Sequence, residues 1–240
     1  MKQSGVPVTF TGDNSYATAT NSFKLLSFSI DASREIFRRA EQTLGPYMNT
    51  PYLAATVCSV LGQLCRNRGY SGSEKIMLPM TVDLRDSRTG NETLFFNQWS
   101  LAPFVSSIAE TMDFKTLAEE FKRQFIDFSR SGFMQDIRKA NLLTRIMPLP
   151  IFSRMSAGIF AGTAGSCSYA FIPESSFKSS TFMGKPVKRL LHLPLMPPAP
   201  GLGVFMTVYN EQLTITISYR NGVLSSSEAE TLLSNLKELL

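Results

Sequence analysis

The chain has 240 residues, of which 43% are hydrophobic and 18% charged, and its formal net charge is +5. This length and composition are typical of a globular protein with a large core, and they exclude a disordered chain. No run of about twenty apolar residues occurs, so we expect no membrane span, and the N-terminus shows no secretory signal. The three cysteines, an odd number without metal-ligand spacing, favour reduced thiols in a cytoplasmic protein.

Residues 1–21 are rich in Gly, Ser, Thr and Asn, and we expect them to form a linker or an arm that buries little. Residues 22–240 are predicted to form a single lobe. Its first element is a strand over 23–30, followed by a helix that Asp31 or Ser33 caps and that Gly45 ends. A second helix is expected to begin at Thr50, a capping hydroxyl followed by proline, and to end at Gly69.

A strand, a charged turn and a second strand are predicted over residues 75–101. Apolar residues alternate with others along the first strand, which is typical of a strand buried on one face. Asp83 and Arg85 follow at its exit, where they form either a surface ion pair or a clamp for the turn. Gly90 and Asn91 are a turn pair that leads into an aromatic second strand over 94–101.

Asp113 is predicted to cap a long helix with one aromatic face, which ends near residue 143 after a break at Gly132. The next segment, 147–160, is apolar and interrupted by prolines, and it fits no standard element. It is interpreted as a buried crossing segment, a lid or a membrane-touching loop. Basic residues outnumber acidic ones by seven to two between Lys122 and Arg154, a local surplus that attracts anions or acidic partners.

The C-terminal part is predicted to be mainly strands. They cover residues 166–173, 187–195, 201–209 and 212–219, the last two joined as a hairpin. In the last strand Thr214, Thr216 and Ser218 alternate with apolar residues, so one of its faces is solvated or lines a polar cavity. A capping box of Ser225 and Glu228 then begins the final helix. This order of elements predicts an α+β fold, with a mixed, mostly antiparallel sheet and helices packed on one side.

No complete catalytic group is visible in the sequence, so we assign no catalytic residue. The single histidine, His192, lacks a carboxylate and a nucleophile nearby in sequence, and a structural role is favoured over a general base. The chain has no GxSxG elbow, no metal-ligand spacing and no nucleic-acid motif. Ser166 and Ser168 follow Gly165 and either face a cavity or simply begin a strand.

Several blocks together resemble the C-terminal lobe of the condensation-domain and chloramphenicol-acetyltransferase-like acyltransferases. The first is PMTVDLR over 79–85 with Gly90-Asn91 and the aromatic strand behind it. The others are TPYLAATVCSVLGQL over 50–64, the strand over 166–171, and the closing hairpin and helix over 201–240. The order of these blocks is more specific than any one of them, and the likeness covers the chain from about residue 20 onward.

The resemblance implies one of two lobes that enclose a substrate tunnel. The co-substrate would be an acyl-CoA or a phosphopantetheine thioester, and no cofactor is expected to be tightly bound. Ser166, Ser168 and Tyr169 would lie near the tunnel, whereas Asp83, Arg85, Gly90 and Asn91 would be structural. The family's catalytic base lies in an HHxxxDG motif on the N-terminal lobe, and this sequence contains no such motif.

The resemblance therefore predicts a tunnel-forming lobe that is inactive alone and that needs a missing N-terminal lobe. An acyl carrier protein is a further partner that the basic run would suit. The alternative is a non-catalytic binding protein of the same fold, in which a homodimer buries the exposed junction. A third interpretation is attachment to a membrane surface through the apolar 147–160 segment and its basic flanks.

Overall fold

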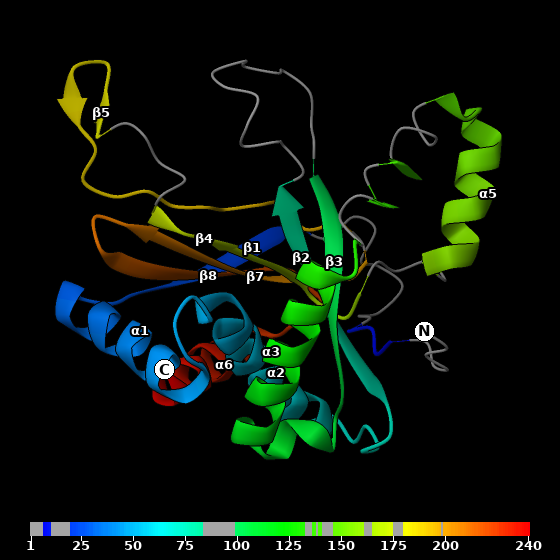
Figure 1. The fold of residues 1–240 in the computed structure, drawn as a ribbon, viewed down its shortest axis with the longest axis horizontal. Coiled ribbons are helices and arrows are strands. Elements are labelled where there is room, and N and C mark those ends of the chain that lie inside the picture. Colours follow the sequence, from blue (N-terminus) through cyan, green and yellow to red (C-terminus); the bar gives the residue numbers. More distant parts are fainter. Residues whose placement is uncertain are drawn as a thin grey trace.

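The computed structural model describes most of the chain, and Figure 1 shows its course. The described residues are 7–10, 20–83, 99–132, 136–137, 139–140, 146–160, 165–174, 180–197 and 199–240. The side chains of Asp83, of Trp99 and of residues 156–160 are not among them. Of the predicted turn, Arg85, Gly90 and Asn91 therefore lie outside the described residues.

Eight strands and six helical segments have described bounds. The strands are β1 (Asn21–Ser27), β2 (Lys75–Asp83), β3 (Trp99–Ser107), β4 (Ser168–Ile172), β5 (Thr181–Phe182), β6 (Lys185–Pro186), β7 (Leu202–Tyr209) and β8 (Gln212–Arg220). The helices are α1 (Ile30–Leu44), α2 (Asn49–Asn67), the 3₁₀ turn η2 (Glu110–Met112), α3 (Phe114–Arg130), α5 (Leu149–Phe160) and α6 (Ser226–Leu239).

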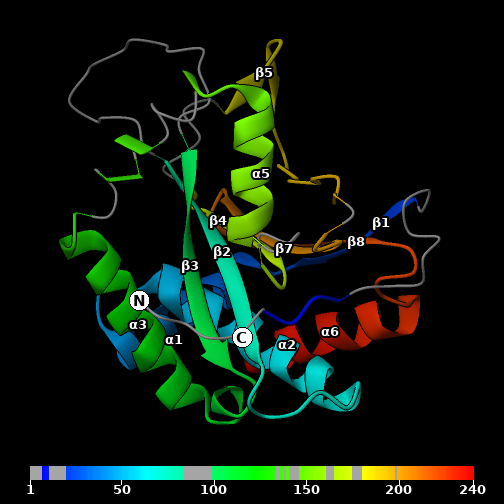
Figure 2. The ribbon, with the colours of Figure 1, turned by 90° about the vertical axis from the view of Figure 1, so that its right-hand side faces the viewer.

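Six of the strands form one sheet in the order β1-β8-β7-β4-β2-β3, and β5 and β6 form a separate hairpin. The β1–β8, β8–β7 and β2–β3 pairs are antiparallel, whereas β4 runs parallel to both of its neighbours. Helices α1, α2, α3 and α6 all lie on one face of this sheet (Figures 1 and 2). The predicted fold class, a mostly antiparallel sheet with helices on one side, is confirmed.

Helix α2 is the centre of the helical layer. Thirteen of its residues are buried, including small ones such as Ala54 and Ala55 that let neighbouring elements approach closely. Two aromatic contacts join α3 to α2 and to β3. The rings of Tyr52 and Phe114 meet edge to face at 5.4 Å, and those of Phe104 and Phe121 stack at 4.8 Å.

The N-terminal segment contributes to this core, contrary to the expectation that it buries little. Val8 is 5% exposed and Phe10 only 1%, and both belong to the main hydrophobic cluster. The Val8 amide donates to the Lys75 carbonyl at 2.8 Å, which places these residues at the start of β2. The guanidinium of Arg68 lies 5.6 Å from the Phe10 ring centroid. The boundary at residue 22 itself remains a prediction.

Two of the predicted helix starts are confirmed by their capping bonds, and two are wrong. Asp113 accepts from the amides of Lys115 and Thr116 at the start of α3, and Ser225 forms a full capping box with Glu228 in α6. Helix α1 is capped by Ser29, earlier than Asp31 or Ser33. Helix α2 begins one residue before Thr50, without a side-chain cap.

Three other predictions are compared with the structure. Residues 99–101 of the predicted second strand are in β3, which continues to Ser107 along the whole of β2, and residues 94–98 lie outside the described residues. Most of the segment expected to fit no standard element is helix α5. Residues 187–195 form no strand, although they are extended. Within the described part of the chain, no helix is long and apolar enough to cross a membrane.

We expect Gly62→Ala to destabilise the lobe although alanine favours helix formation. A Cβ at position 62 would lie 1.9 Å from Thr111 Oγ1, which already donates to the Ile108 carbonyl and accepts from Arg66. The buried threonine cannot move without losing those bonds, so unfolding should become easier by about 1–3 kcal/mol. Urea denaturation measures this. Gln63→Ala, one position along α2, is the control and should change stability far less.

The ion pair of Glu228 with Arg68 leads us to expect that the lobe becomes less stable in acid. The Glu228 side chain accepts from Arg68 Nε at 2.8 Å, and this bond chiefly lowers its pKa from 4.5 to about 2. Because the folded pKa is depressed, the stabilisation is fully present above pH 4.5 and is lost as the pH falls towards 2. Arg68→Ala should cost about 1–2 kcal/mol at pH 7 and flatten this acid dependence.

Lys24→Ala serves as the control, because Lys24 pairs with Glu230 on the same helix but at an exposed site. Its acid dependence should match that of the unmodified chain. If Arg68→Ala retained the full acid dependence, the pairing of Arg68 and Glu228 would not be its source. Urea denaturation of the three proteins over the acidic pH range gives the comparison.

Candidate functional site

The sheet has a second face, opposite the helices, and its residues differ from those of the helical face. Along β8, Leu213, Ile215, Ile217 and Tyr219 belong to the main core, whereas Thr214, Thr216, Ser218 and Arg220 alternate with them and face the other way. The pairing register adds Gly203, Phe205, Thr207 and Tyr209 from β7, and Ser168, Ala170 and Ile172 from β4. We call this surface the strap face.

An extended segment, residues 187–197, lies across the strap face, and we call it the strap (Figure 1). Along the strap, residues 190, 192, 194 and 196 are more buried than residues 191, 193 and 195. Three hydrogen bonds fix its ends. Tyr209 Oη donates to the Val187 carbonyl at 3.2 Å, the Met196 amide donates to Asn21 Oδ1 at 2.8 Å, and Arg220 donates to the Met196 carbonyl at 3.5 Å.

Gly203 makes room for the apolar contact between the strap and the sheet. A Cβ at this position would lie 2.5 Å from the Phe205 ring and 2.7 Å from Met196 Sδ. Because position 203 has no side chain, the Phe205 ring and Met196 pack there with Ala170 as a small hydrophobic cluster, separate from the main core. The strap is therefore packed onto this face by apolar contact as well as by hydrogen bonds.

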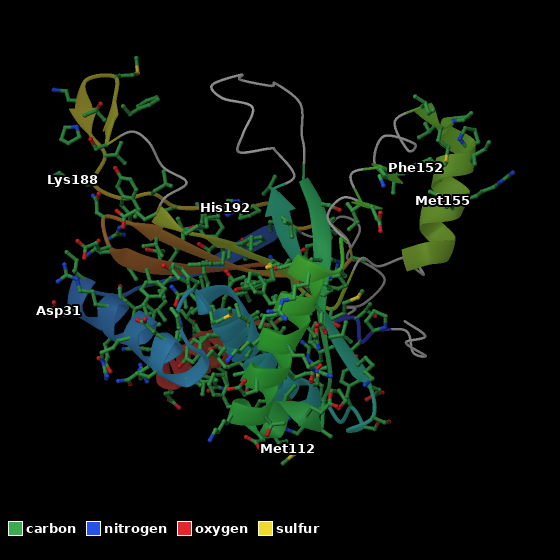
Figure 3. All side chains as sticks on the ribbon, viewed as in Figure 1. Asp31, Met112, Phe152, Met155, Lys188 and His192 are labelled. Carbon is green, nitrogen blue, oxygen red and sulfur yellow. The ribbon has the colours of Figure 1, made fainter. Side chains whose placement is uncertain are left out.

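His192 packs against this cluster, with its ring 5.1 Å from that of Phe205 (Figure 3). Burial lowers the pKa of His192, so the neutral imidazole is favoured. Its Nδ1 atom is buried without a hydrogen-bond partner in the described structure. A general base needs an orienting partner at this nitrogen, and the described residues supply none. A structural role for His192 stays a prediction.

Hydroxyl groups form the polar part of the strap face. Thr207, Thr216 and Ser218 are each 2% exposed, and Ser218 Oγ has no hydrogen-bond partner in the described structure. A buried polar atom without a partner costs roughly 1–3 kcal/mol, so native structures usually supply one. Ser218 and His192 thus give this face two buried polar atoms that a bound molecule or water could satisfy.

The three predicted tunnel residues do not lie together. Ser166 is fully buried, and its Oγ accepts from the Met77 amide at 3.1 Å beside β2. Tyr169 points to the helical side, where its hydroxyl donates to the Thr50 carbonyl at 3.4 Å and burial raises its pKa. Ser168 alone is on the strap face, half-buried and paired with Gly203. A role for Ser168 in a tunnel stays a prediction.

Asp83 is the last residue of β2 and pairs with Trp99, and its predicted structural role stays a prediction. The alternation along β8 predicted that Ser218 lies on a face that is solvated or lines a polar cavity, and the structure places it on the strap face. Sequence reasoning missed Asn21, because nothing in the sequence marks it as an anchor. Among the residues that the structure describes, no cluster of His, Cys, Asp and Glu could hold a metal ion.

The sequence matches no family model and no curated protein. In contrast, the fold matches many solved structures. A trichothecene 15-O-acetyltransferase from Fusarium sporotrichioides superposes with a TM-score of 0.67 at 14% identity, over 92% of this chain and 46% of that one. TRI101 of the same fungus, solved with coenzyme A and T-2, gives 0.60 at 18% identity, over 92% of this chain and 49% of that one.

An epimerization domain of tyrocidine synthetase B matches with a TM-score of 0.62 at 10% identity, over the whole of this chain and 51% of that one. The chain thus spans about half the length of these structures, whose identities are low enough that they establish the fold alone. It has the condensation-domain and chloramphenicol-acetyltransferase-like fold that the sequence blocks predicted.

We expect Asn21→Ala to loosen the strap while leaving the rest of the lobe intact. The substitution removes the acceptor of the Met196 amide, and one such hydrogen bond contributes about 1 kcal/mol. Amide hydrogen exchange in residues 190–197 should therefore accelerate roughly fivefold, with little change in α2. Asn221→Ala is the control, because Asn221 bonds to Ser22 and Thr20 near the same strand end without touching the strap. Equal acceleration in both variants would contradict the anchoring role of Asn21.

Proposed function

We propose that this chain forms the C-terminal, tunnel-forming lobe of an acyltransferase. The enzyme would transfer an acyl group from a CoA or carrier-protein thioester to an alcohol or an amine. The observation that carries the proposal is the strap face: one side of an acyltransferase-like sheet is filled by helices, and the other presents buried hydroxyls with an unpaired Ser218 Oγ. The match to about half of each acetyltransferase structure supports it.

The chemistry available on this face is binding rather than proton transfer. Hydroxyls and a neutral imidazole can donate and accept hydrogen bonds with amide and carbonyl groups, such as those of a pantetheine arm. His192 lies against an apolar ring and not against a carboxylate in the described structure. We therefore infer that the base comes from an HHxxxDG motif on a second lobe, and that an acyl-CoA is a co-substrate rather than a tightly bound cofactor.

The second lobe would approach from the strap side. The outward residues of the strap are apolar and exposed, with Leu191 at 38%, Leu193 at 39% and Leu195 at 80%. Such a row of exposed apolar side chains on the outer side of the strap favours burial against another protein surface. The alternative proposal, a binding protein of the same fold, would bury this row in a homodimer, and analytical ultracentrifugation of the chain at increasing concentration would detect that dimer.

The test is an acyl-transfer assay that follows thiol release from acetyl-CoA and longer acyl-CoA donors, with a panel of alcohols and amines. The chain alone should give no release above the buffer rate, because it lacks a positioned base. Addition of a lobe that carries an HHxxxDG motif should produce acceptor-dependent release that is lost when that motif's histidine becomes alanine. His192→Phe of this chain should keep the kcat of this release and raise only KM, because it removes a binding group and not the base. Turnover by the chain alone that disappears in His192→Phe would overturn the proposal.

Ser218 provides a finer readout of the same site. Because its hydroxyl is buried and unpaired, Ser218→Ala should not weaken the fold, and removal of an unsatisfied buried group can even stabilise it. If the hydroxyl binds the donor or the acceptor, the variant should raise KM by about fivefold in the reconstituted enzyme, the effect of losing about 1 kcal/mol of binding. An unchanged KM for every substrate would remove Ser218 from the site.

A further inference from the structure

Helix α5 lies apart from the helical layer. In Figures 1 and 2 it is on the side of the sheet away from α1, α2, α3 and α6. Each described side chain of this helix, from Leu149 to Met155, is exposed. None of them belongs to either hydrophobic cluster of the lobe. The first two turns of α5 therefore gain no stability from packing on the core.

The exposed residues of α5 are unusually apolar for such a position. Leu149 is 74% exposed, Ile151 55%, Phe152 38% and Met155 37%, and Ile146 just before the helix is 81% exposed. At 100° per residue, Ile151, Phe152 and Met155 fall within one third of the helix circumference, and Ser153 and Arg154 lie outside that arc. An isolated helix of about this length is marginal in water, so these residues favour a nonaqueous surface.

The sequence that flanks α5 is basic, although Arg138 and Arg145 lie outside the described residues and Lys139 pairs with Asp136 at 3.8 Å. Between Asp136 and Glu174 the sequence has no acidic residue, but it has the four basic residues Arg138, Lys139, Arg145 and Arg154. Arg154 is exposed on the helix itself, next to the apolar arc. A surface that combines exposed apolar side chains with an exposed cation such as Arg154 is complementary to anionic lipid headgroups over an acyl interior.

We propose that α5 binds the surface of an anionic bilayer. The helix would lie in the plane of the interface, with Ile151, Phe152 and Met155 among the acyl chains and the Arg154 stem extended to the headgroups. Twelve residues of helix span only about 18 Å, so α5 is too short to cross the membrane and can only lie on it.

Charge favours a lipid over a protein groove as the occupant. The central part of a protein interface is depleted of charged residues, whereas interfacial helices combine an apolar face with basic neighbours, as α5 does. The proposal is independent of acyl transfer, because α5 contributes no residue to the strap face as defined by the strands and the strap. Loss of membrane binding would leave the proposed function of the lobe untouched.

The test is cosedimentation of the whole chain with phosphatidylcholine vesicles that contain either no anionic lipid or about 30% phosphatidylglycerol. Binding should occur with the anionic vesicles and should weaken as salt is raised. Ile151→Asp should reduce partitioning at least tenfold, because it places a charge in the apolar arc. Arg154→Ala should reduce it about fivefold, as expected for one basic residue near an anionic surface.

Two control variants locate the contact. Met112→Asp places the same charge on an exposed methionine of the helical side, far from α5 in Figure 3, and should not change partitioning. Met183→Asp places this charge at the tip of the β5–β6 hairpin, where Met183 is 87% exposed, and it should not change partitioning either. If Met183→Asp reduced binding as much as Ile151→Asp, the contact would not be specific to α5 and the proposal would fail.

Tryptophan fluorescence of the Phe152→Trp variant detects membrane insertion directly, without relying on a variant that loses binding. The added tryptophan should show a blue-shifted emission with anionic vesicles and quenching by brominated acyl chains, relative to the unmodified chain with its single tryptophan. Circular dichroism of each variant verifies its fold. If the unmodified chain ignored anionic vesicles, or if a protein partner rather than lipid shifted the emission of Trp at position 152, the proposal would be overturned.

Discussion

The burial of α2 against one face of the sheet is the constraint on which the rest of the lobe depends. This helix is covered on nearly all sides, and it approaches the η2 turn so closely at Gly62 that a methyl group would overlap Thr111. A helix buried in this way requires other helices around it, so α1, α3 and α6 also lie on this side (Figure 2). The opposite face then has no helical layer and is left to the strap.

That asymmetry accounts for the composition of the central strands. In β7 and β8 every residue except the exposed Gln212 is buried, yet only the side chains on the helical face are consistently apolar. Threonine and serine occupy the strap face, where apolar residues would pack as well and leave no unpaired hydroxyl. Buried polar atoms without partners are more typical of binding sites than of structural cores, which is why we assign the function to this face.

The sequence predicted the elements whose signals are local. Asp113, Ser225 and Glu228 cap helices because a side chain reaches an amide two or three residues away, and such spacing is visible in sequence. The alternation along β8 likewise predicted both faces of that strand. The direction of Ser166 and Tyr169 was not predictable, because it depends on which residue of β4 pairs with β7 and β2, a matter of register between distant segments.

The strap illustrates why a correct local signal can still give a wrong element. Residues 189–197 alternate in burial, as a strand does, and the segment has an extended course (Figure 1). A strand also needs a free edge, and β7 already pairs with β4 and β8, so the segment crosses over β7 instead of joining the sheet. Among the described strands, β1 and β3 are the edges of the six-stranded sheet. The sequence pattern therefore predicted the extended conformation of the strap. It could not predict that both edges of β7 are already paired, which keeps the strap out of the sheet.

The same arrangement separates substrate binding from proton transfer. The strap holds His192 against Phe205, burial lowers the pKa of the imidazole, and its Nδ1 atom has no hydrogen-bond partner among the described residues. A base placed in this way would be poorly oriented, whatever its pKa. If the lobe takes part in acyl transfer, its contribution must be the hydroxyl-lined surface that positions the reactants, because positioning alone can lower a barrier substantially when the base is supplied from the facing side.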